Sequence, residues 1–152
     1  MPHLIVEYSE NLDRRHGGAV AIDGLVRALH HGALATGIAP LDALRTRAAA
    51  REHFAIADEH PANGFIAVTA RLGAGRSAAD KRALIGALMD ALTEHLGDAQ
   101  HDLMLSVEYQ EIDPAFRLNL NHVRTRMAGQ VDAKGSDPNA STLAGGRGGA
   151  AT

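Results

Sequence analysis

The sequence predicts an α/β fold in which two fused β-α-β units form a four-stranded sheet with helices on one face. Segments with the two-residue period of strands alternate with segments that have helical spacing of apolar residues, in the order β-α-β, polar connection, β-α-β. The crossover in each unit is long enough for the parallel pairing that such a unit requires. Because 45% of the 152 residues are hydrophobic and none is Trp, we expect one aliphatic core.

The first unit begins almost at the start of the chain. Residues 3–8 alternate, with Leu4, Val6 and Tyr8 on one face of the expected strand. A helix follows, whose apolar residues are spaced i, i+3, i+4 and i+7: Ile22, Leu25, Val26 and Leu29. Gly37 lies where a glycine ends a helix. Residues 40–48, PLDALRTRA, predict a second strand with Arg45 and Arg47 on one face, and residues 49–63 form a polar connection.

The second unit repeats this pattern. Residues 64–72 predict a strand, and Ser77 with Asp80 forms a capping-box pattern that begins a helix. The buried stripe of that helix is Leu84, Ile85, Leu88, Leu92 and Leu96. Residues 103–112 predict the fourth strand. We therefore expect a domain over residues 1–126, with halves of about 1–60 and 61–126, and a disordered Gly/Ala-rich tail over residues 127–152.

The composition excludes several classes of protein. Without cysteine the chain has no disulfides, thiol nucleophiles or thiolate metal sites. A net charge of -3 lacks the basic field of a nucleic-acid binder, so we expect no nucleic-acid partner. The absence of a signal-peptide pattern and of a long apolar stretch predicts no membrane partner and a cytoplasmic protein. Since helices cover one face of the sheet, we expect another copy of the chain to cover the other.

Two patterns that suggest a cofactor have simpler explanations. Residues 73–78, GAGRSA, match the dinucleotide fingerprint G-x-G-x-x-A, but two glycines also make a tight strand-to-helix turn. The chain has no room for a second nucleotide-binding half. His30 and His31 are neighbours that point about 100° apart on a helix, and no HExxH spacing occurs, so we expect no metal site.

Arginines and an N-terminal proline form a third pattern. Arg45, Arg47 and Arg76 are either solvated surface residues or bind an anion, because a guanidinium matches a carboxylate in bidentate fashion. Pro2 is either the tolerated first residue of a strand or, once Met1 is removed, a free secondary amine. An α-amino group has a reference pKa of roughly 7.7 to 8.0, which burial and nearby arginines lower toward the range of an effective general base.

These residues resemble the tautomerase superfamily. PLDALRTR and GAGRSAADKRALI are similar to segments of 4-oxalocrotonate tautomerase. MPHLIVEYSEN, LATGIAPLDALRTR, LGAGRS and FRLNLNHVR are similar to segments of the 5-carboxymethyl-2-hydroxymuconate isomerase family, the duplicated branch of that superfamily. The resemblance covers about residues 2–126.

The resemblance implies a tautomerase-like fold and an enzyme without metal or organic cofactor. Pro2 takes the place of the catalytic base, and Arg45 and Arg76 those of the substrate-binding arginines. Arg47 is a second candidate for a substrate carboxylate, and Phe54 is expected to wall the pocket. The implied substrate is a dicarboxylate or tricarboxylate, namely 5-carboxymethyl-2-hydroxymuconate of homoprotocatechuate degradation. The implied assembly is a homotrimer with sites near subunit boundaries. A tautomerase for a smaller 2-oxo acid and a non-catalytic trimeric binding protein are the alternatives.

The two halves differ at the positions of these site residues. Leu12 stands in the first half where the turn arginine would be. In the second half, Ile66 replaces the proline and Glu108 replaces the strand arginine. We therefore expect at most one complete site per chain, built from parts of both halves that come either from one chain or from neighbouring chains.

Overall fold

A computed structural model describes the backbone of residues 2–135 and the side chains of residues 2–130. The strands are β1 (His3–Ser9), β2 (Arg45–Arg51), β3 (Gly64–Gly73) and β4 (Leu103–Ile112), and the helices are α1 (Ile22–Ala35), α2 (Ala78–Leu96) and α3 (His122–Gly135). Short 3-10 turns lie at Glu10–Leu12, Arg14–His16, Gly97–Gln100 and Pro114–Phe116. The chain divides into two units, residues 1–120 and the part from residue 121 onward that contains α3.

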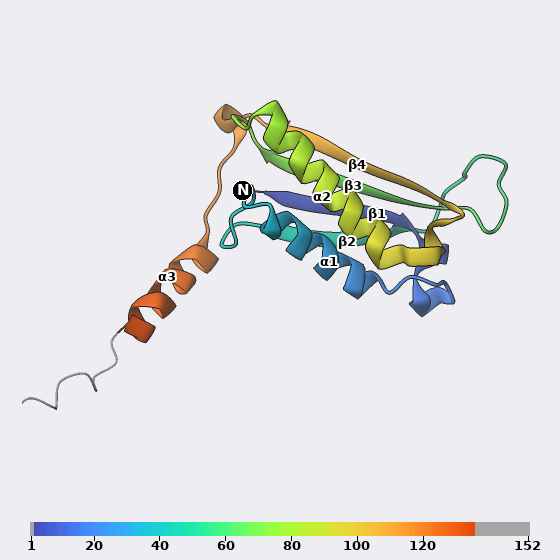
Figure 1. The fold of residues 1–152 in the computed structure, drawn as a ribbon, viewed down its shortest axis with the longest axis horizontal. Coiled ribbons are helices and arrows are strands. Elements are labelled where there is room, and N and C mark those ends of the chain that lie inside the picture. Colours follow the sequence, from blue (N-terminus) through green and yellow to red (C-terminus); the bar gives the residue numbers. More distant parts are fainter. Residues whose placement is uncertain (1, 136–152) are drawn as a thin grey trace, which may run out of the picture. The chain divides into compact units, whose positions relative to one another are not determined.

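The sheet of the first unit has four strands in the order β2-β1-β3-β4. β1 pairs in parallel with β2, with His3 opposite Arg45, and β3 pairs in parallel with β4. The two halves meet where β1 pairs with β3 in antiparallel fashion, with His3 opposite Arg71. Helices α1 and α2 lie against the same face of this sheet (Figure 1). The predicted fold class is confirmed.

The core lies between the sheet and the two helices. Leu4, Val6 and Tyr8 of β1 are buried there, as predicted from their alternation. α1 and α2 approach closely, because a Cβ added at Gly32 would lie 3.1 Å from Cβ of Ala91. The residues of the opposite face, such as His3, Ile5 and Glu7 of β1, are half-buried. We call this the open face; its cover by another copy of the chain stays a prediction.

The expected helix boundaries agree with the structure. α1 ends at Ala35, and Gly37 has a left-handed φ of 70°. At the start of α2, the Ser77 hydroxyl accepts a hydrogen bond from the Asp80 backbone N–H at 3.0 Å, and the Asp80 carboxylate accepts one from the Ser77 N–H at 3.3 Å. This is the predicted capping box. None of the helices in the described part of the chain has the length and apolar content to span a bilayer.

The second strand differs from its predicted range of residues 40–48. Residues 40–44 form a turn, because the N–H groups of Ala43 and Leu44 both donate to the Pro40 carbonyl at 3.1 Å. β2 therefore begins at Arg45 and continues to Arg51. Leu44 and Arg45 alternate as predicted, but Leu44 lies one residue before the first residue of β2 that pairs with β1.

The expectation of disorder from residue 127 is wrong for residues 127–135, which continue helix α3. This segment contains Met127, Ala128 and Gln130, whose intrinsic helix propensity is high. Apolar periodicity missed it because residues 122–130, the part of the helix whose side chains are described, include no fully buried side chain. Residues 136–152 of the expected tail lie outside the described residues.

Candidate active site

The topology brings Pro2, Arg45 and Arg76 to one end of the sheet, which we call the proline end. Pro2 is buried directly before β1, and its carbonyl accepts a hydrogen bond from the Arg45 N–H at 3.2 Å. Since β3 runs antiparallel to β1, the turn after β3 that carries Arg76 returns to this end. Three of the five site residues predicted from the sequence are thus gathered, and the letter N marks this end in Figure 1.

His3 lies between Arg45 and Arg47 of β2 on the open face. Its Nε2 is 2.7 Å from Nη2 of Arg45, and its Nδ1 is 3.1 Å from Nη1 of Arg47. Burial, and then the charges of Arg45 and Arg47, lower the pKa of His3 below its usual value. A neutral imidazole accepts through one nitrogen only, so it satisfies one guanidinium and presents an N–H to the other. His3 therefore cannot accept a hydrogen bond from both guanidinium groups.

Arg76 is held against backbone carbonyls. Its Nη1 donates to the Gly73 carbonyl at 2.9 Å, and its Nη2 donates to the Ile38 carbonyl at 3.2 Å. The second contact links the turn after β3 to the connection between α1 and β2. A guanidinium has more N–H groups than these two, so Arg76 retains donors for an anion.

The proline end is rich in positive charge. Arg71 lies opposite His3, and Arg117 lies beside Gly73. Neither Arg71 nor Arg117 was predicted from the sequence as a site residue. The ion pairs that the structure describes join Arg15 to Asp13, His16 to Glu10, Arg51 to Glu7 and Lys81 to Glu111. In the described part of the chain, therefore, no ion pair neutralises Arg71, Arg76 or Arg117. Such a cluster suits a ligand with more than one carboxylate.

Phe54 lies at the other end of the sheet from Pro2. β2 runs parallel to β1 away from the proline end, and Phe54 comes shortly after Arg51, the last residue of β2. Seven residues of strand separate the two ends by about 20 Å. The Phe54 ring packs edge-on against Phe65, with centroids 6.4 Å apart. Within one chain, the structure does not bring this fifth predicted residue to Pro2.

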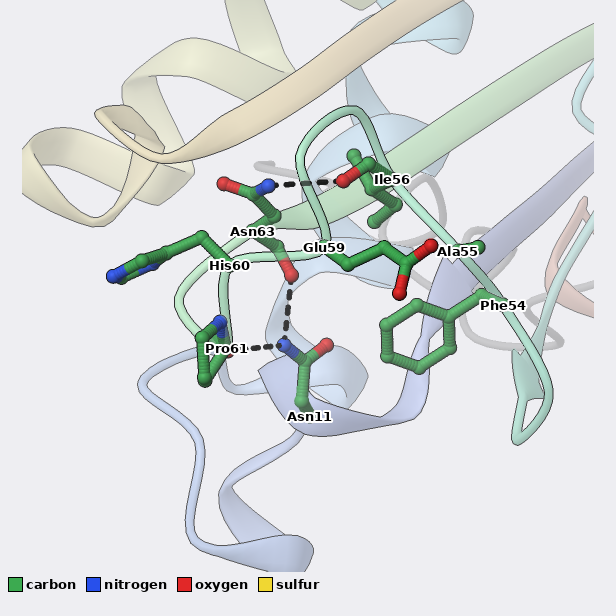
Figure 2. A pocket seen from close by; sticks show the side chains of 8 residues that line it. All are labelled: Asn11, Phe54, Ala55, Ile56, Glu59, His60, Pro61 and Asn63. Carbon is green, nitrogen blue, oxygen red and sulfur yellow. Dashed lines mark hydrogen bonds between the residues drawn. The ribbon is translucent and has the colours of Figure 1, made fainter.

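A hollow of about 310 Å³ lies beside Phe54 (Figure 2). It is lined by Asn11, Phe54, Ala55, Ile56, Glu59, His60, Pro61 and Asn63. Asn11 donates to the Asn63 carbonyl at 2.9 Å, and Asn63 donates to the Ile56 carbonyl at 3.0 Å, so its walls are tied together. The lining contains the carboxylate of Glu59 and no arginine. The proline end is therefore the better site for an anionic ligand.

The glycine-rich turn after β3 does not belong to a nucleotide-binding fold. Gly75 has a φ of 102°, so the backbone conformation of the turn is enough to explain a glycine at this position. The sheet consists of two parallel pairs joined in antiparallel fashion, whereas a dinucleotide-binding sheet is mostly parallel. Here the turn places Arg76 instead.

Known proteins resemble this chain over nearly all of its first 127 residues. The model of the family described as "5-carboxymethyl-2-hydroxymuconate isomerase" matches residues 2–127. The 5-carboxymethyl-2-hydroxymuconate Delta-isomerase of Escherichia coli is 29% identical over 125 residues, which is 81% of this chain and 96% of that protein.

Solved structures show the same relationship. A 5-carboxymethyl-2-hydroxymuconate isomerase from Deinococcus radiodurans R1 has a TM-score of 0.73 and 34% identity, covering 83% of this chain and 93% of its own. A structure described as "F6 fused 4-OT wild type asymmetric trimer" shares the fold, with a TM-score of 0.57 and 19% identity, covering 82% of this chain and 98% of its own.

Proposed function

The chain belongs to the 5-carboxymethyl-2-hydroxymuconate isomerase family, and on that premise we propose that Pro2 is the general base that converts 5-carboxymethyl-2-hydroxymuconate to its 2-oxo-3-ene tautomer. The family makes the chain a cofactor-independent isomerase of the tautomerase type. The observation that carries the proposal is the position of Pro2, buried at the start of β1 beside Arg45 and at the same end of the sheet as Arg76.

The proposed mechanism moves one proton. The neutral Pro2 nitrogen accepts the proton of the 2-hydroxyl of the dienol, the double bonds shift, and Pro2 returns the proton to a distant carbon. The atoms balance without a co-reactant. The neighbouring guanidinium groups disfavour a positive charge on Pro2 and so favour its basic form. The mechanism requires removal of Met1, because an acylated proline nitrogen has no basic lone pair.

The arginines have two functions in this mechanism. Arg45 and Arg76 bind carboxylates of the substrate, with Arg47 as a further candidate, and so orient the dienol toward Pro2. They also stabilise the negative charge that develops on the 2-oxygen. Donors arranged in advance around such an oxygen contribute roughly 3 to 4 kcal/mol each in other enzymes.

We further propose a homotrimer in which Phe54 of one chain walls the site of its neighbour. The open face gives each copy a surface to bury. Because Phe54 lies far from Pro2 of its own chain, it can wall a Pro2 site only in a neighbouring chain. Trimers are named among the proteins that share the fold. The proposed place of the enzyme is homoprotocatechuate degradation in the cytoplasm.

Pro2→Ala tests the proposal. After intact-mass analysis confirms loss of Met1, the ultraviolet band of the dienol is followed with wild type and variant. We expect kcat to fall by about 10²- to 10⁴-fold, the usual contribution of a general base, with an unchanged circular dichroism spectrum. Pro138→Ala, which lies outside the matched residues 2–127, is the control.

The outcomes separate the alternatives. Undiminished activity of Pro2→Ala would make the proline structural. Turnover of smaller 2-oxo acids in place of the tricarboxylate would assign a different tautomerase reaction. No turnover of either by the processed protein would favour a binding protein.

A further inference from the structure

Arg117 is held at the proline end by the turn that follows β4. Asp113 begins this turn, because its carboxylate accepts a hydrogen bond from the Ala115 N–H at 2.8 Å. The extended chain beyond the turn alternates, so that Phe116 is 88% and Leu118 102% exposed whereas Arg117 is half-buried. Arg117 therefore points back toward its own sheet while its neighbours point away.

Gly73 provides the surface on which the Arg117 guanidinium lies. A Cβ added to Gly73 would lie 3.4 Å from Nη1 of Arg117 and 4.0 Å from its Cζ and Nη2. Gly73 has no left-handed backbone conformation to explain a glycine, so its missing side chain matters for this contact. The carbonyl of the same residue accepts the hydrogen bond from Arg76. Two guanidinium groups thus lie around one residue.

Gly73, which both guanidinium groups approach, is close to Pro2 in the sheet. In the antiparallel register His3 is opposite Arg71, so the next step places Leu72 opposite Pro2 and Gly73 one position beyond. Gly73 and Arg71 have the same side-chain direction along β3, toward the open face. The Arg117 guanidinium therefore lies on the open face beside the start of β1.

We infer that Arg117, which lies at Gly73 as Arg76 does, binds the third carboxylate of the substrate and so selects tricarboxylates over dicarboxylates. This inference rests on the proposed function. Two arginines, Arg45 and Arg76, match the two carboxylates of a simple dienol diacid, and 5-carboxymethyl-2-hydroxymuconate has one carboxylate more. In the described chain no ion pair neutralises Arg117, so its guanidinium has a donor fork to offer this third group.

Arg117→Met tests the assignment by steady-state kinetics. For the tricarboxylate we expect KM to rise at least about tenfold with kcat changed less than about threefold, the pattern of a lost binding contact. For 2-hydroxymuconate, which lacks the carboxymethyl group, we expect KM to change less than about threefold. Arg117→Lys keeps the charge without the planar fork and should give an intermediate KM. Arg82→Met, an exposed arginine of α2, is the control. Equal changes in KM for both substrates, or no change for either, would overturn the assignment.

Binding of an inert anion separates this inference from the proposed reaction. Titration calorimetry with tricarballylate and with glutarate needs no turnover. We expect wild type to bind tricarballylate more tightly than glutarate, and Arg117→Met to abolish that preference. If wild type does not isomerise the dienol but shows the Arg117-dependent preference, the proposed reaction fails and the carboxylate site stands. If the preference is absent in wild type or survives in Arg117→Met, the inference fails.

Discussion

At the scale of single residues, the buried carboxylate of Asp13 fixes the chain after β1. Its side chain accepts hydrogen bonds from the Tyr8 hydroxyl at 3.1 Å and from Nη2 and Nε of Arg15 at 2.7 and 3.0 Å. The Arg15 backbone N–H donates to the other oxygen at 3.0 Å. These hydrogen bonds from Arg15 are the main cause that lowers the pKa of Asp13 to about 2.

The lowered pKa of Asp13 predicts a loss of stability in acid. Because the folded-state pKa lies below the unfolded value of 3.8, the stabilisation is complete above pH 3.8 and is lost as pH falls toward about 2. We expect this carboxylate to contribute on the order of 1 to 2 kcal/mol to the free energy of unfolding at pH 7, discounted because Arg15 is solvent-exposed.

Urea unfolding of wild type, Asp13→Asn and the exposed control Asp98→Asn at pH 7 and pH 3 measures this contribution. Asp13→Asn should be less stable than wild type at pH 7, and the difference should shrink at pH 3. A difference that is equal at both pH values would show that the charge of Asp13 is not the cause.

The residues of the proline end differ in how far the sequence could predict them. Pro2 and Arg76 belong to local patterns, a strand start and a strand-to-helix turn. Arg45 is placed correctly because its alternation continues into β2. His3 and Arg117 were not predicted, because they lie at this site through contacts with Arg45 and Gly73, which are more than forty residues away along the chain. Only the three-dimensional fold reveals such contacts.

At the scale of elements, α1 and α2 pack through small residues. A Cβ at Gly32 of α1 would lie 3.1 Å from Cβ of Ala91 and 3.5 Å from the Ala87 carbonyl. A Cβ at Gly24 would lie 2.8 Å from the His95 ring, whose Nε2 is 3.2 Å from the Ala21 carbonyl. The glycines thus set the separation of the helices that cover the sheet.

Gly32→Leu should therefore destabilise the fold. The leucine has to push the helices apart, and overpacking of this kind costs about 1 to 3 kcal/mol of unfolding free energy. Gly86→Leu is the matched control, because it lies on α2 with no heavy atom within 4 Å of an added Cβ. Gly86→Leu should be neutral or stabilising, since leucine has the higher helix propensity. Thermal unfolding of both variants gives the comparison. Equal stability would show that the helix separation adapts without cost.

The types of the four strands and of α1 and α2 were predictable from periodicity, whereas α3 and the registers of the strands were not. Comparison of the two halves of the sequence placed Glu108 of the second half at the position that Arg45 has in the first half. The ladder shows Glu108 opposite Thr69, whereas Ser106 is opposite Ala67, the residue after Ile66. If Ile66 occupies the position of Pro2, Ser106 is therefore the counterpart of Arg45. The face is the same in either case, because positions two apart share a side of the strand. The second half still has a non-arginine residue at that position.

At the scale of the whole molecule, one chain separates residues that the proposed site requires. Pro2 and Phe54 lie at opposite ends of the sheet, about 20 Å apart along the strands. The sequence could not reveal this, because the distance depends on the parallel pairing of β1 with β2. Phe54 of one chain reaches Pro2 of another only in an assembly whose interface joins opposite ends of two sheets.

Mixing two inactive chains tests this sharing. Chains with Pro2→Ala and chains with Phe54→Ala are refolded together in equal amounts. If each site takes Pro2 from one chain and Phe54 from a neighbour, about a quarter of the sites have both residues unaltered, and activity appears. The double variant alone is the negative control. Activity no higher than the average of the two separate variants would place Phe54 and Pro2 of each site in the same chain.

The ladder between β1 and β3 has one more consequence. It pairs residues of the two halves, from His3 with Arg71 to Tyr8 with Ile66. Within each half the two strands pair in parallel, β1 with β2 and β3 with β4. The loop of residues 52–63, most of which is exposed, adds covalent continuity between the halves and no strand of its own. It acts as a tether that sets the effective concentration of one half around the other. The polypeptide is in this sense a dimer of β-α-β pieces made permanent by a single linker.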